Sequence, residues 1–248
     1  MASRKPYIVK KLESKVKSAI YNYNLIEEGE GVMVGISGGK DSYALLNLLV
    51  SLRQSMPDKF LIEACHVQAQ DMPYKADETF MRDYCHENEI PLHFRQITVD
   101  YRPEGRQPAC FICSWKRRKA LFAVTRERNC KKLALGHHLD DAVETLLMNM
   151  IHHSSISSMP PKLSMFDGEL FTIRPLILVH DNELKKYSQI MEFPSEVSLC
   201  PHEDETNRDS VRELIRASEK LNRSARENIF RSMGTIYHDY IVNKPKKK

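Results

Sequence analysis

Short apolar runs alternate with segments of helical periodicity over the first 151 residues of the chain. The runs at 31–36, 60–68, 92–99 and 132–137 are rich in β-branched or other apolar residues and predict buried strands. Between them, segments 41–54, 77–89 and 114–128 predict helices. Strands that alternate with helices in this way predict a doubly wound α/β fold around a parallel sheet.

Helical patterns also flank this region. Ile8, Leu12, Val16, Ala19 and Ile20 follow helical spacing near the start, and residues from 206 to about 243 form a charged helical tail. We therefore expect a helical lead over 1–30, a main domain over 31–200 and a helical tail over 201–248.

The alternation of strands and helices becomes less regular after residue 151. Residues 152–169 are polar, contain Pro160 and Pro161, and predict a loop. A last strand is expected at 170–179, followed by a helix for which Asp181 is the expected N-cap.

Composition favours a cytoplasmic protein with a polyanionic partner. The 248 residues are 42% hydrophobic and contain neither an apolar run of membrane-spanning length nor an N-terminal signal core. The net charge is only +4, but residues 114–132 hold eight basic side chains against one acidic. Local basic patches of this kind are typical of proteins that bind nucleic acid, although a solvated helix face is the simpler interpretation.

The stretch "GISGGKDSYALL" at 35–46 lies where the first predicted strand ends and a helix begins. In parallel sheets, ligands bind beyond this end of the strands. Gly38 and Gly39 permit close approach of the backbone, Lys40 can balance phosphate charge, and Asp41 can hold Mg²⁺ or cap the helix. Ser37 and Ser42 add hydroxyls. The spacing does not fit a Walker loop.

A second candidate stretch is "LALGHHLDDAVETLLMNM" at 133–150. Leu139, Ala142, Val143, Leu146, Leu147 and Met150 form one apolar helix face. Asp140 and Asp141 lie in the first turn, where carboxylates either complement the helix dipole or hold Mg²⁺.

The third stretch, "PACFICSWKRRKALF" at 108–122, contains the pair Cys110 and Cys113. Such a pair is a redox dithiol, half of a zinc site or part of an iron–sulfur site. Cys200 is the other cysteine in a polar loop context, whereas Cys65, Cys85 and Cys130 are expected to be buried.

"SGGKDS" after an apolar strand resembles the pyrophosphate-binding loop of the PP-loop ATP pyrophosphatases, and "GHHLDDAVET" resembles the second signature of that family. With "CFICSWKRRKALF", "SMPPKLSMFDGE" and "TIRPL", the resemblance extends to tRNA 2-thiocytidine synthetases over about residues 30–200. It implies a sheet of the PP-loop type that binds ATP with Ser37, Gly38, Gly39, Lys40, Asp41, Ser42 and Gly136. It also implies that Asp41 and Asp141 organise Mg²⁺.

The same resemblance implies a [4Fe–4S] cluster on Cys110, Cys113 and Cys200, although "VSLC" departs from the family's pattern around the last. The implied reaction is adenylation of the C2 carbonyl of cytidine 32 in tRNA, followed by replacement of that oxygen with sulfur. Arg117 is expected to hold substrate or stabilise charge. A sulfur donor such as a cysteine desulfurase and a homodimer are further expectations.

Three alternatives remain open from the sequence. Cys110, Cys113, Cys200 and His202 would make a closed Cys₃His zinc site. Another tRNA-modifying enzyme of the same family, such as a 2-thiouridine or lysidine synthetase, would share the loop. A metal-bearing nucleic-acid binder without catalysis would bind tRNA but release no pyrophosphate.

Overall fold

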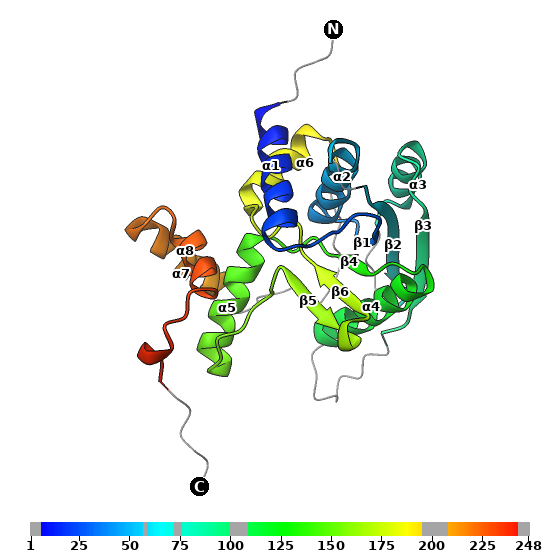
Figure 1. Ribbon diagram of the computed structural model, residues 1–248. Helices are drawn as coiled ribbons and strands as arrows, with labels where there is room; N and C mark the ends of the chain where they lie inside the picture. Colours follow the sequence, from blue (N-terminus) through cyan, green and yellow to red (C-terminus); the bar gives the residue numbers. More distant parts are fainter. Residues whose placement is uncertain (1–5, 57–58, 72–75, 100–108, 195–207, 243–248) are drawn as a thin grey trace. The chain divides into compact units, whose positions relative to one another are not determined.

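The computed structural model describes residues 6–56, 59–71, 76–99, 109–194 and 208–242. Its helices are α1 (Tyr7–Asn22), α2 (Lys40–Ser55), α3 (Glu78–Glu87), α4 (Ala109–Glu127), α5 (Leu139–His153), α6 (Asp181–Ile190), α7 (Arg208–Leu221) and α8 (Ala225–Ser232), with short 3₁₀ turns η1 (Phe166–Gly168) and η2 (His238–Tyr240). Its strands are β1 (Gly31–Ile36), β2 (Leu61–Ala69), β3 (Leu92–Ile97), β4 (Lys132–Ala134), β5 (Lys162–Met165) and β6 (Leu170–Ile173) (Figure 1). Of the helices in these ranges, none combines the length and the apolar content that a membrane span requires.

The chain forms two compact units. The first contains residues 1–138 and 160–204, and the second contains residues 139–159 and 205–248. The expected division into 1–30, 31–200 and 201–248 stays a prediction, and its boundary at residue 200 lies outside the described residues.

A six-stranded sheet with the order β3-β2-β1-β4-β6-β5 forms the centre of the first unit (Figure 1). All neighbouring strands are parallel except β5 and β6, which are antiparallel. The chain moves outward from β1 to β2 and β3, then returns to place β4 on the other side of β1. The predicted doubly wound sheet is therefore confirmed, and the loops after β1 and β4 adjoin its switch point, the usual ligand site in such folds.

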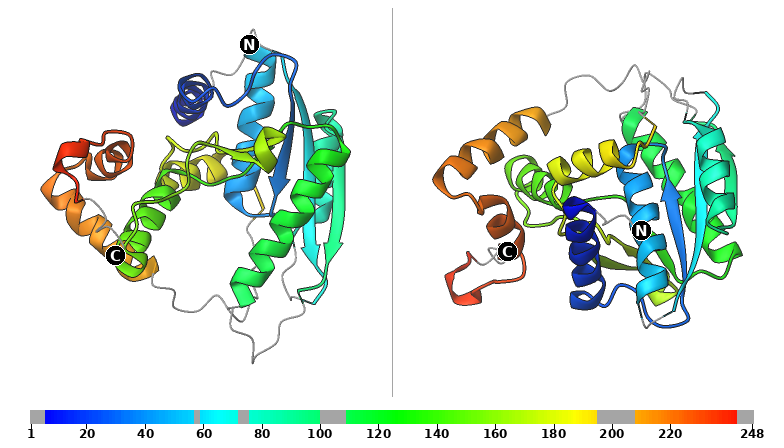
Figure 2. Two further views of the ribbon diagram at one scale, coloured as in Figure 1. Left: turned by 60° about the horizontal axis from the view of Figure 1, so that its bottom comes forward. Right: turned by 90° about the horizontal axis from the view of Figure 1, so that it is seen from above.

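Helices cover both faces of this sheet (Figure 2). Because the connections through α2 and α4 cross the sheet in opposite directions, right-handed crossovers put these helices on opposite faces. Leu121 and Val124 of α4 pack with Met33, Cys65 and Leu133 of the strands. On the other face, α2 contacts α1 and α6, and the buried side chains of α1 are Val9, Leu12, Val16, Ala19 and Ile20.

A buried carboxylate fastens α1 to α6. Lys11 Nζ and Lys15 Nζ lie 2.8 Å and 2.7 Å from the two carboxylate oxygens of Glu183, whose side chain is 9% exposed. The His180 backbone N–H also donates to Glu183. Burial alone would raise the pKa of Glu183, but the hydrogen bonds from Lys11, Lys15 and His180 outweigh it and lower the pKa to about 2.

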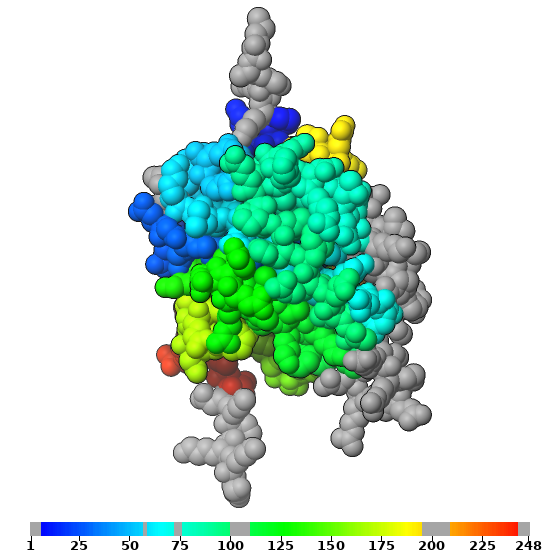
Figure 3. Space-filling model, turned by 90° about the vertical axis from the view of Figure 1, so that its right-hand side faces the viewer, coloured from blue at the N-terminus to red at the C-terminus, as the bar shows by residue number. Residues whose placement is uncertain are grey.

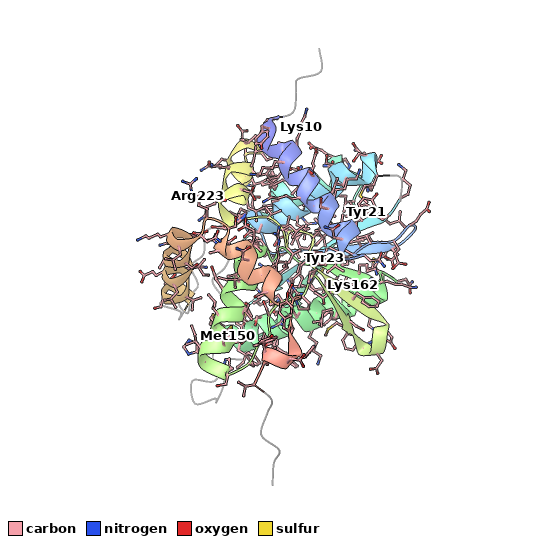
Figure 4. All side chains as sticks on the ribbon, turned by 60° about the vertical axis from the view of Figure 1, so that its left-hand side comes forward. Lys10, Tyr21, Tyr23, Met150, Lys162 and Arg223 are labelled. Carbon is pink, nitrogen blue, oxygen red and sulfur yellow. The ribbon has the colours of Figure 1, made fainter. Side chains whose placement is uncertain are left out.

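Strand β5 closes the far edge of the sheet. Lys162 Nζ donates to the Asn24 carbonyl at 2.7 Å, so β5 is held against the turn that follows α1. Figure 4 shows Lys162 beside Tyr23 at this turn.

The second unit consists of α5, α7, α8 and η2 in the described residues. Val211, Ile215 and Phe230 are buried among these helices with Leu146 of α5. Arg212 Nε lies 2.9 Å from Glu144 Oε1, which ties α7 to α5 by a charged pair.

Four predictions from the sequence need correction. Helix α4 begins at Ala109 rather than at residue 114, so the cysteine pair lies inside the helix. Residues 152–169 hold the strand β5, and β6 ends at Ile173 rather than at 179. His180 is the N-cap residue of α6, and Asp181 is its first residue.

The Glu183 contacts predict how stability depends on pH. Glu183→Gln removes the charge that faces Lys11 and Lys15, so we expect it to lower the free energy of unfolding by about 2 kcal/mol at pH 7. The folded-state pKa is lowered, so this contribution is present above pH 4.5 and is lost as the pH falls toward about 2. Urea unfolding at pH 7 and pH 3.5 measures it.

Glu28→Gln, which changes an exposed carboxylate, is the matched control and should cost little. An equal loss from Glu183→Gln at both pH values would contradict the assignment.

Candidate functional site

The loop between β1 and α2 is shaped by its own hydroxyls. Gly38 has a φ of +100°, which side chains other than glycine rarely adopt. The Ser42 hydroxyl donates to the Gly39 carbonyl at 2.8 Å and accepts from the Ser37 backbone N–H at 3.2 Å. The Gly39 N–H donates to the Ser37 hydroxyl at 3.1 Å. These bonds fold the loop over the start of α2, where helix N–H groups favour an anion.

Lys40 lies between two carboxylates at this edge of the sheet. Its Nζ is 2.7 Å from Asp41 Oδ1 and 2.9 Å from Asp181 Oδ1. Burial alone would lower the pKa of Lys40, but hydrogen bonds to Asp41 and Asp181 raise it, so the ammonium is charged at neutral pH. Lys40 therefore places a cation beside the loop.

Asp181 connects three elements. Besides Lys40, it contacts Lys185 Nζ at 2.7 Å and lies 3.9 Å from His138 Nε2. Burial would raise the pKa of Asp181, but Lys185 and Lys40 outweigh that effect and lower it to about 2. Ligand atoms of Asp41, His138 and Asp181 lie within 4.8 Å of one another, which suits a divalent cation.

The chain passes very close to this loop again after β4. A Cβ added to Gly136 would lie 3.2 Å from the backbone carbonyl of Asp41 and 3.3 Å from the Ser42 nitrogen. Only a residue without a side chain fits there without moving the first turn of α2. Gly136 thus sets how closely the β4 end approaches the loop.

Helix α4 projects beyond the same edge of the sheet. A Cβ on Gly35 would lie 3.2 Å from Leu121 Cδ1, so Leu121 packs one residue before β1 ends. At about 1.5 Å per residue, Arg117 lies about 6 Å and Cys113 about 12 Å further along the helix, past the strand ends. Spacings of four residues put Cys113, Arg117 and Leu121 on one face of α4.

The five described cysteines differ in exposure. Cys110 is exposed and Cys113 is half-buried, whereas Cys65, Cys85 and Cys130 are buried. Burial raises the pKa of the Cys65 thiol to about 12 and those of Cys85 and Cys130 to about 11. Metal ligands are thiolates, so these three are poor ligands and Cys110 and Cys113 fit that role.

His66 supports the end of β1. Its ring Nδ1 lies 2.8 Å from the Ile36 carbonyl, and only 1% of the residue is exposed. Burial lowers the pKa of His66, and the charge of Arg117 lowers it further. The charge of Arg117 therefore acts on a side chain that contacts the carboxyl end of β1.

The paired aspartates of α5 belong to the second unit and have different environments. Asp140 is buried and forms an ion pair with Arg226 of α8, which also lies 3.2 Å from Glu219. Asp141 is only partly buried. The two carboxylates, which are equivalent in the sequence, are therefore not equivalent in the structure.

The structure thus gathers part of the predicted site within the first unit: Ser37, Gly38, Gly39, Lys40, Asp41, Ser42 and Gly136. Helix α4, which projects beyond the same strand edge, carries Arg117, Cys110 and Cys113. Asp141 belongs to the other unit, and Cys200 lies outside the described residues. Sequence reasoning missed Asp181 and His138 as neighbours of Lys40 and Asp41. The histidine pair in "GHHLDD" was the signal for His138.

Residues 8–221 match the model of the PP-loop domain family. A tRNA-cytidine(32) 2-sulfurtransferase of Herminiimonas arsenicoxydans is 36% identical over 240 residues, which cover 94% of this chain and 74% of that protein. The enzyme of the same name from Janthinobacterium sp. (strain Marseille) is 37% identical over 241 residues, covering 95% of this chain and 75% of that protein. The chain belongs to the PP-loop family and, within it, to the tRNA-cytidine(32) 2-sulfurtransferases.

A solved structure supports the same fold for this PP-loop protein. The U34-tRNA thiolase NcsA from Methanococcus maripaludis, determined with its [4Fe-4S] cluster, aligns with a TM-score of 0.77. The alignment covers 96% of this chain and 81% of that chain at 24% identity. The PP-loop arrangement of sheet and helices predicted from the sequence is therefore confirmed.

The close approach at Gly136 gives a test of the loop. Gly136→Ala inserts a methyl group against the first turn of α2, so we expect it to weaken ATP binding at least tenfold. Calorimetry with ATP and Mg²⁺ measures the affinity.

Gly234→Ala is the matched control, because a Cβ there meets its nearest atom at an ordinary 3.6 Å. Unchanged ATP affinity in Gly136→Ala would show that the loop tolerates displacement and does not hold the nucleotide as inferred.

Proposed function

We propose that this protein converts cytidine 32 of tRNA to 2-thiocytidine in an ATP-dependent reaction. The observation that carries the proposal is the position of two accessible cysteines on α4, beyond the same strand edge as the SGGKDS loop. One edge of one sheet then offers both a phosphate-binding loop and a pair of thiols. Membership of the 2-sulfurtransferase family supplies the substrate and the reaction.

The reaction needs activation because a carbonyl oxygen is a poor leaving group. The C2 oxygen of the cytidine attacks the α-phosphate of ATP, and pyrophosphate leaves. A sulfide sulfur then attacks C2, and AMP departs with the original oxygen. One C–O bond is broken and one C–S bond is formed, so the oxidation state of C2 does not change. No external oxidant is needed when the sulfur arrives at the sulfide level.

The loop residues have the roles that the first step requires. Ser37 and Ser42 fix the loop, Gly38 and Gly39 let the phosphates approach the backbone, and Lys40 offsets the charge of the departing pyrophosphate. Arg117 adds a second cation above the strand ends, where negative charge develops as AMP leaves.

A divalent cation fits beside Lys40. Asp41, His138 and Asp181 bring two carboxylates and an imidazole within ligand range of one another. Asp141 is proposed as a Mg²⁺ ligand from the family resemblance of the sequence alone. Mg²⁺ takes oxygen ligands and keeps several waters, so the two carboxylates with waters and phosphate oxygens are sufficient. Bound Mg²⁺ would screen the phosphate charge from the attacking oxygen.

The described cysteines also fit an iron–sulfur cluster. Cys110 is exposed and Cys113 is half-buried on α4, whereas burial raises the pKa of the Cys65, Cys85 and Cys130 thiols and disfavours the thiolate that binds iron. Cys200 is proposed as the third ligand. Cys110, Cys113 and Cys200 would hold the cluster, which would supply the sulfur chemistry when bound. A closed zinc site on Cys110, Cys113, Cys200 and His202 is the competing occupant and would be structural.

We further propose a cytoplasmic location, a cysteine desulfurase or similar sulfur donor, and a homodimer. Comparison of tRNA nucleosides from cells with and without the gene tests the substrate. The expected result is loss of 2-thiocytidine only in cells that lack it. Unchanged 2-thiocytidine, or loss of a thiouridine instead, would contradict the proposal.

Cysteine substitutions test the metal site. Cys110→Ala should abolish the bound iron and sulfide of anaerobically purified protein and reduce thiolation by at least about a hundredfold, because no described thiol can replace it. Cys85→Ala, which removes a buried thiol of α3, should retain the cluster. Iron, sulfide and zinc analyses provide the measurement, and a colourless protein with one equivalent of zinc would overturn the cluster.

The two aspartates of α5 should respond differently. Asp140→Asn removes the buried charge that faces Arg226 and leaves that guanidinium with the more exposed Glu219, so it should lower stability by about 2 kcal/mol. Asp141→Asn should leave stability within about 0.5 kcal/mol but lower thiolation at least tenfold and raise the Mg²⁺ concentration required. Thermal unfolding and Mg²⁺ titrations of activity separate the two. The reverse pattern would make Asp140 the metal ligand.

A further inference from the structure

The face of α4 that points away from the sheet carries two exposed aromatic rings among cations. Phe111 is 48% exposed and Trp115, four residues later, is 52% exposed. Arg118 and Lys119 follow on the same face, at the spacing that makes residues neighbours on a helix. Lys119 Nζ lies 5.5 Å from the centroid of the Trp115 ring. We call these four residues the outer face of α4.

This outer face is distinct from the face that carries the cysteines and Arg117. Cys113, Arg117, Leu121 and Val124 follow spacings of three and four residues, and Leu121 and Val124 are buried against the strands. Phe111 and Trp115 lie roughly a third of a turn or more from that line. Figure 3 shows a side of the first unit on which the green surface of α4 lies beside β3 and α3.

Within the part of the chain that the structure describes, Phe111 and Trp115 are the more exposed aromatic rings of α4. Phe122 on the same side of α4 is covered, because its ring contacts Phe166 at 5.4 Å between centroids. Phe111 and Trp115 instead leave about half of their area to solvent. Grouped exposed aromatic side chains mark a surface that another molecule covers.

We propose that the outer face of α4 binds single-stranded nucleotides of the tRNA loop that contains the target base. This inference rests on the proposed function and deepens it. Bases stack on aromatic side chains, and lysine and arginine neutralise the phosphates between them. Residues 114–132 hold eight basic side chains against one acidic, so the charge of this helix complements RNA.

Two different faces of α4 would then contact the target base and the nucleotides beside it. A helix with its side chains is about 10 Å across, a distance that neighbouring nucleotides of one loop can straddle. The target base enters on the face with Cys113 and Arg117, while nucleotides beside it stack on Phe111 and Trp115. Stacking outside the reacting face holds the base in place without occupying the site of sulfur transfer.

Trp115 is the chain's single tryptophan and reports on its own environment. Anaerobically purified full-length protein is titrated with an anticodon stem–loop RNA that carries cytidine 32, and with a duplex of the same stem without the loop. We expect saturable quenching of the Trp115 fluorescence by the stem–loop and little change with the duplex. Affinities of variants are measured by anisotropy of labelled RNA.

Substitutions separate stacking from general attraction. Trp115→Ala should weaken stem–loop binding about tenfold or more, since a base–aromatic contact is lost, whereas Trp115→Phe should stay within about threefold. Tyr21→Ala is the matched control: Tyr21 of α1 is 47% exposed and has Lys17 Nζ 5.9 Å from its ring (Figure 4). It should leave RNA affinity unchanged.

Three results would overturn the inference. The first is full RNA affinity in Trp115→Ala, and the second is an equal loss of RNA affinity in Trp115→Ala and Tyr21→Ala. The third is a Trp115→Ala protein that keeps its RNA affinity but loses self-association in sedimentation. The last would assign the outer face to a second copy. If the wild-type protein thiolates tRNA but Trp115→Ala binds it normally, only this inference fails. If the wild-type protein does not thiolate tRNA, the proposed function fails instead.

Discussion

The contact between Leu121 of α4 and Gly35 of β1 sets the geometry on which the site depends. A Cβ at position 35 would lie 3.2 Å from Leu121 and 3.1 Å from Leu135, so a larger residue there would have to displace these leucine side chains. That contact fixes the position of α4 along the direction of the strands. Because a helix is stiff, it also fixes how far Arg117, Cys113 and Cys110 project beyond the strand ends. The phosphate loop begins two residues after the same glycine, so one contact relates both parts of the site.

Ion pairs hold the charged side chains beside the phosphate loop in place, as packing holds α4. Lys40 is paired with Asp41 and Asp181, and Asp181 is also paired with Lys185. These pairs hold the ammonium groups at the strand edge without leaving any of the charges uncompensated. A polyphosphate that enters can take Lys40 as a partner and leaves the carboxylates to a cation, so the arrangement is balanced in both states.

Much of this could be predicted from the sequence because it is local. The strands, the loop and the cysteine pair are each encoded within about a dozen residues, where periodicity and turn chemistry are readable. The start of α4 was predicted five residues late, since the segment before Ser114 carries Pro108 and no clear apolar period. Strand β5 was missed because it is a short, half-exposed edge strand that follows two prolines.

What the sequence could not reveal depends on contacts between distant residues. Asp181 lies 141 positions from Lys40, and no local pattern relates them. Similarly, "DD" in the sequence does not distinguish Asp140 from Asp141, because the distinction comes from Arg226, 86 positions away. The outer face of α4 was visible only as a basic segment until the burial of Leu121 and Val124 defined which side of the helix Trp115 occupies.

In the proposed reaction, ATP activates the C2 oxygen of the tRNA cytidine before sulfur replaces it. The most direct test supplies tRNA labelled with ¹⁸O at C2 of cytidine 32, together with ATP and sulfide, to the anaerobic enzyme, and analyses the products by mass spectrometry. We expect one AMP for each 2-thiocytidine, with the ¹⁸O carried on the phosphate of that AMP. Thiolation with unlabelled AMP, or with ADP as the product, would contradict it.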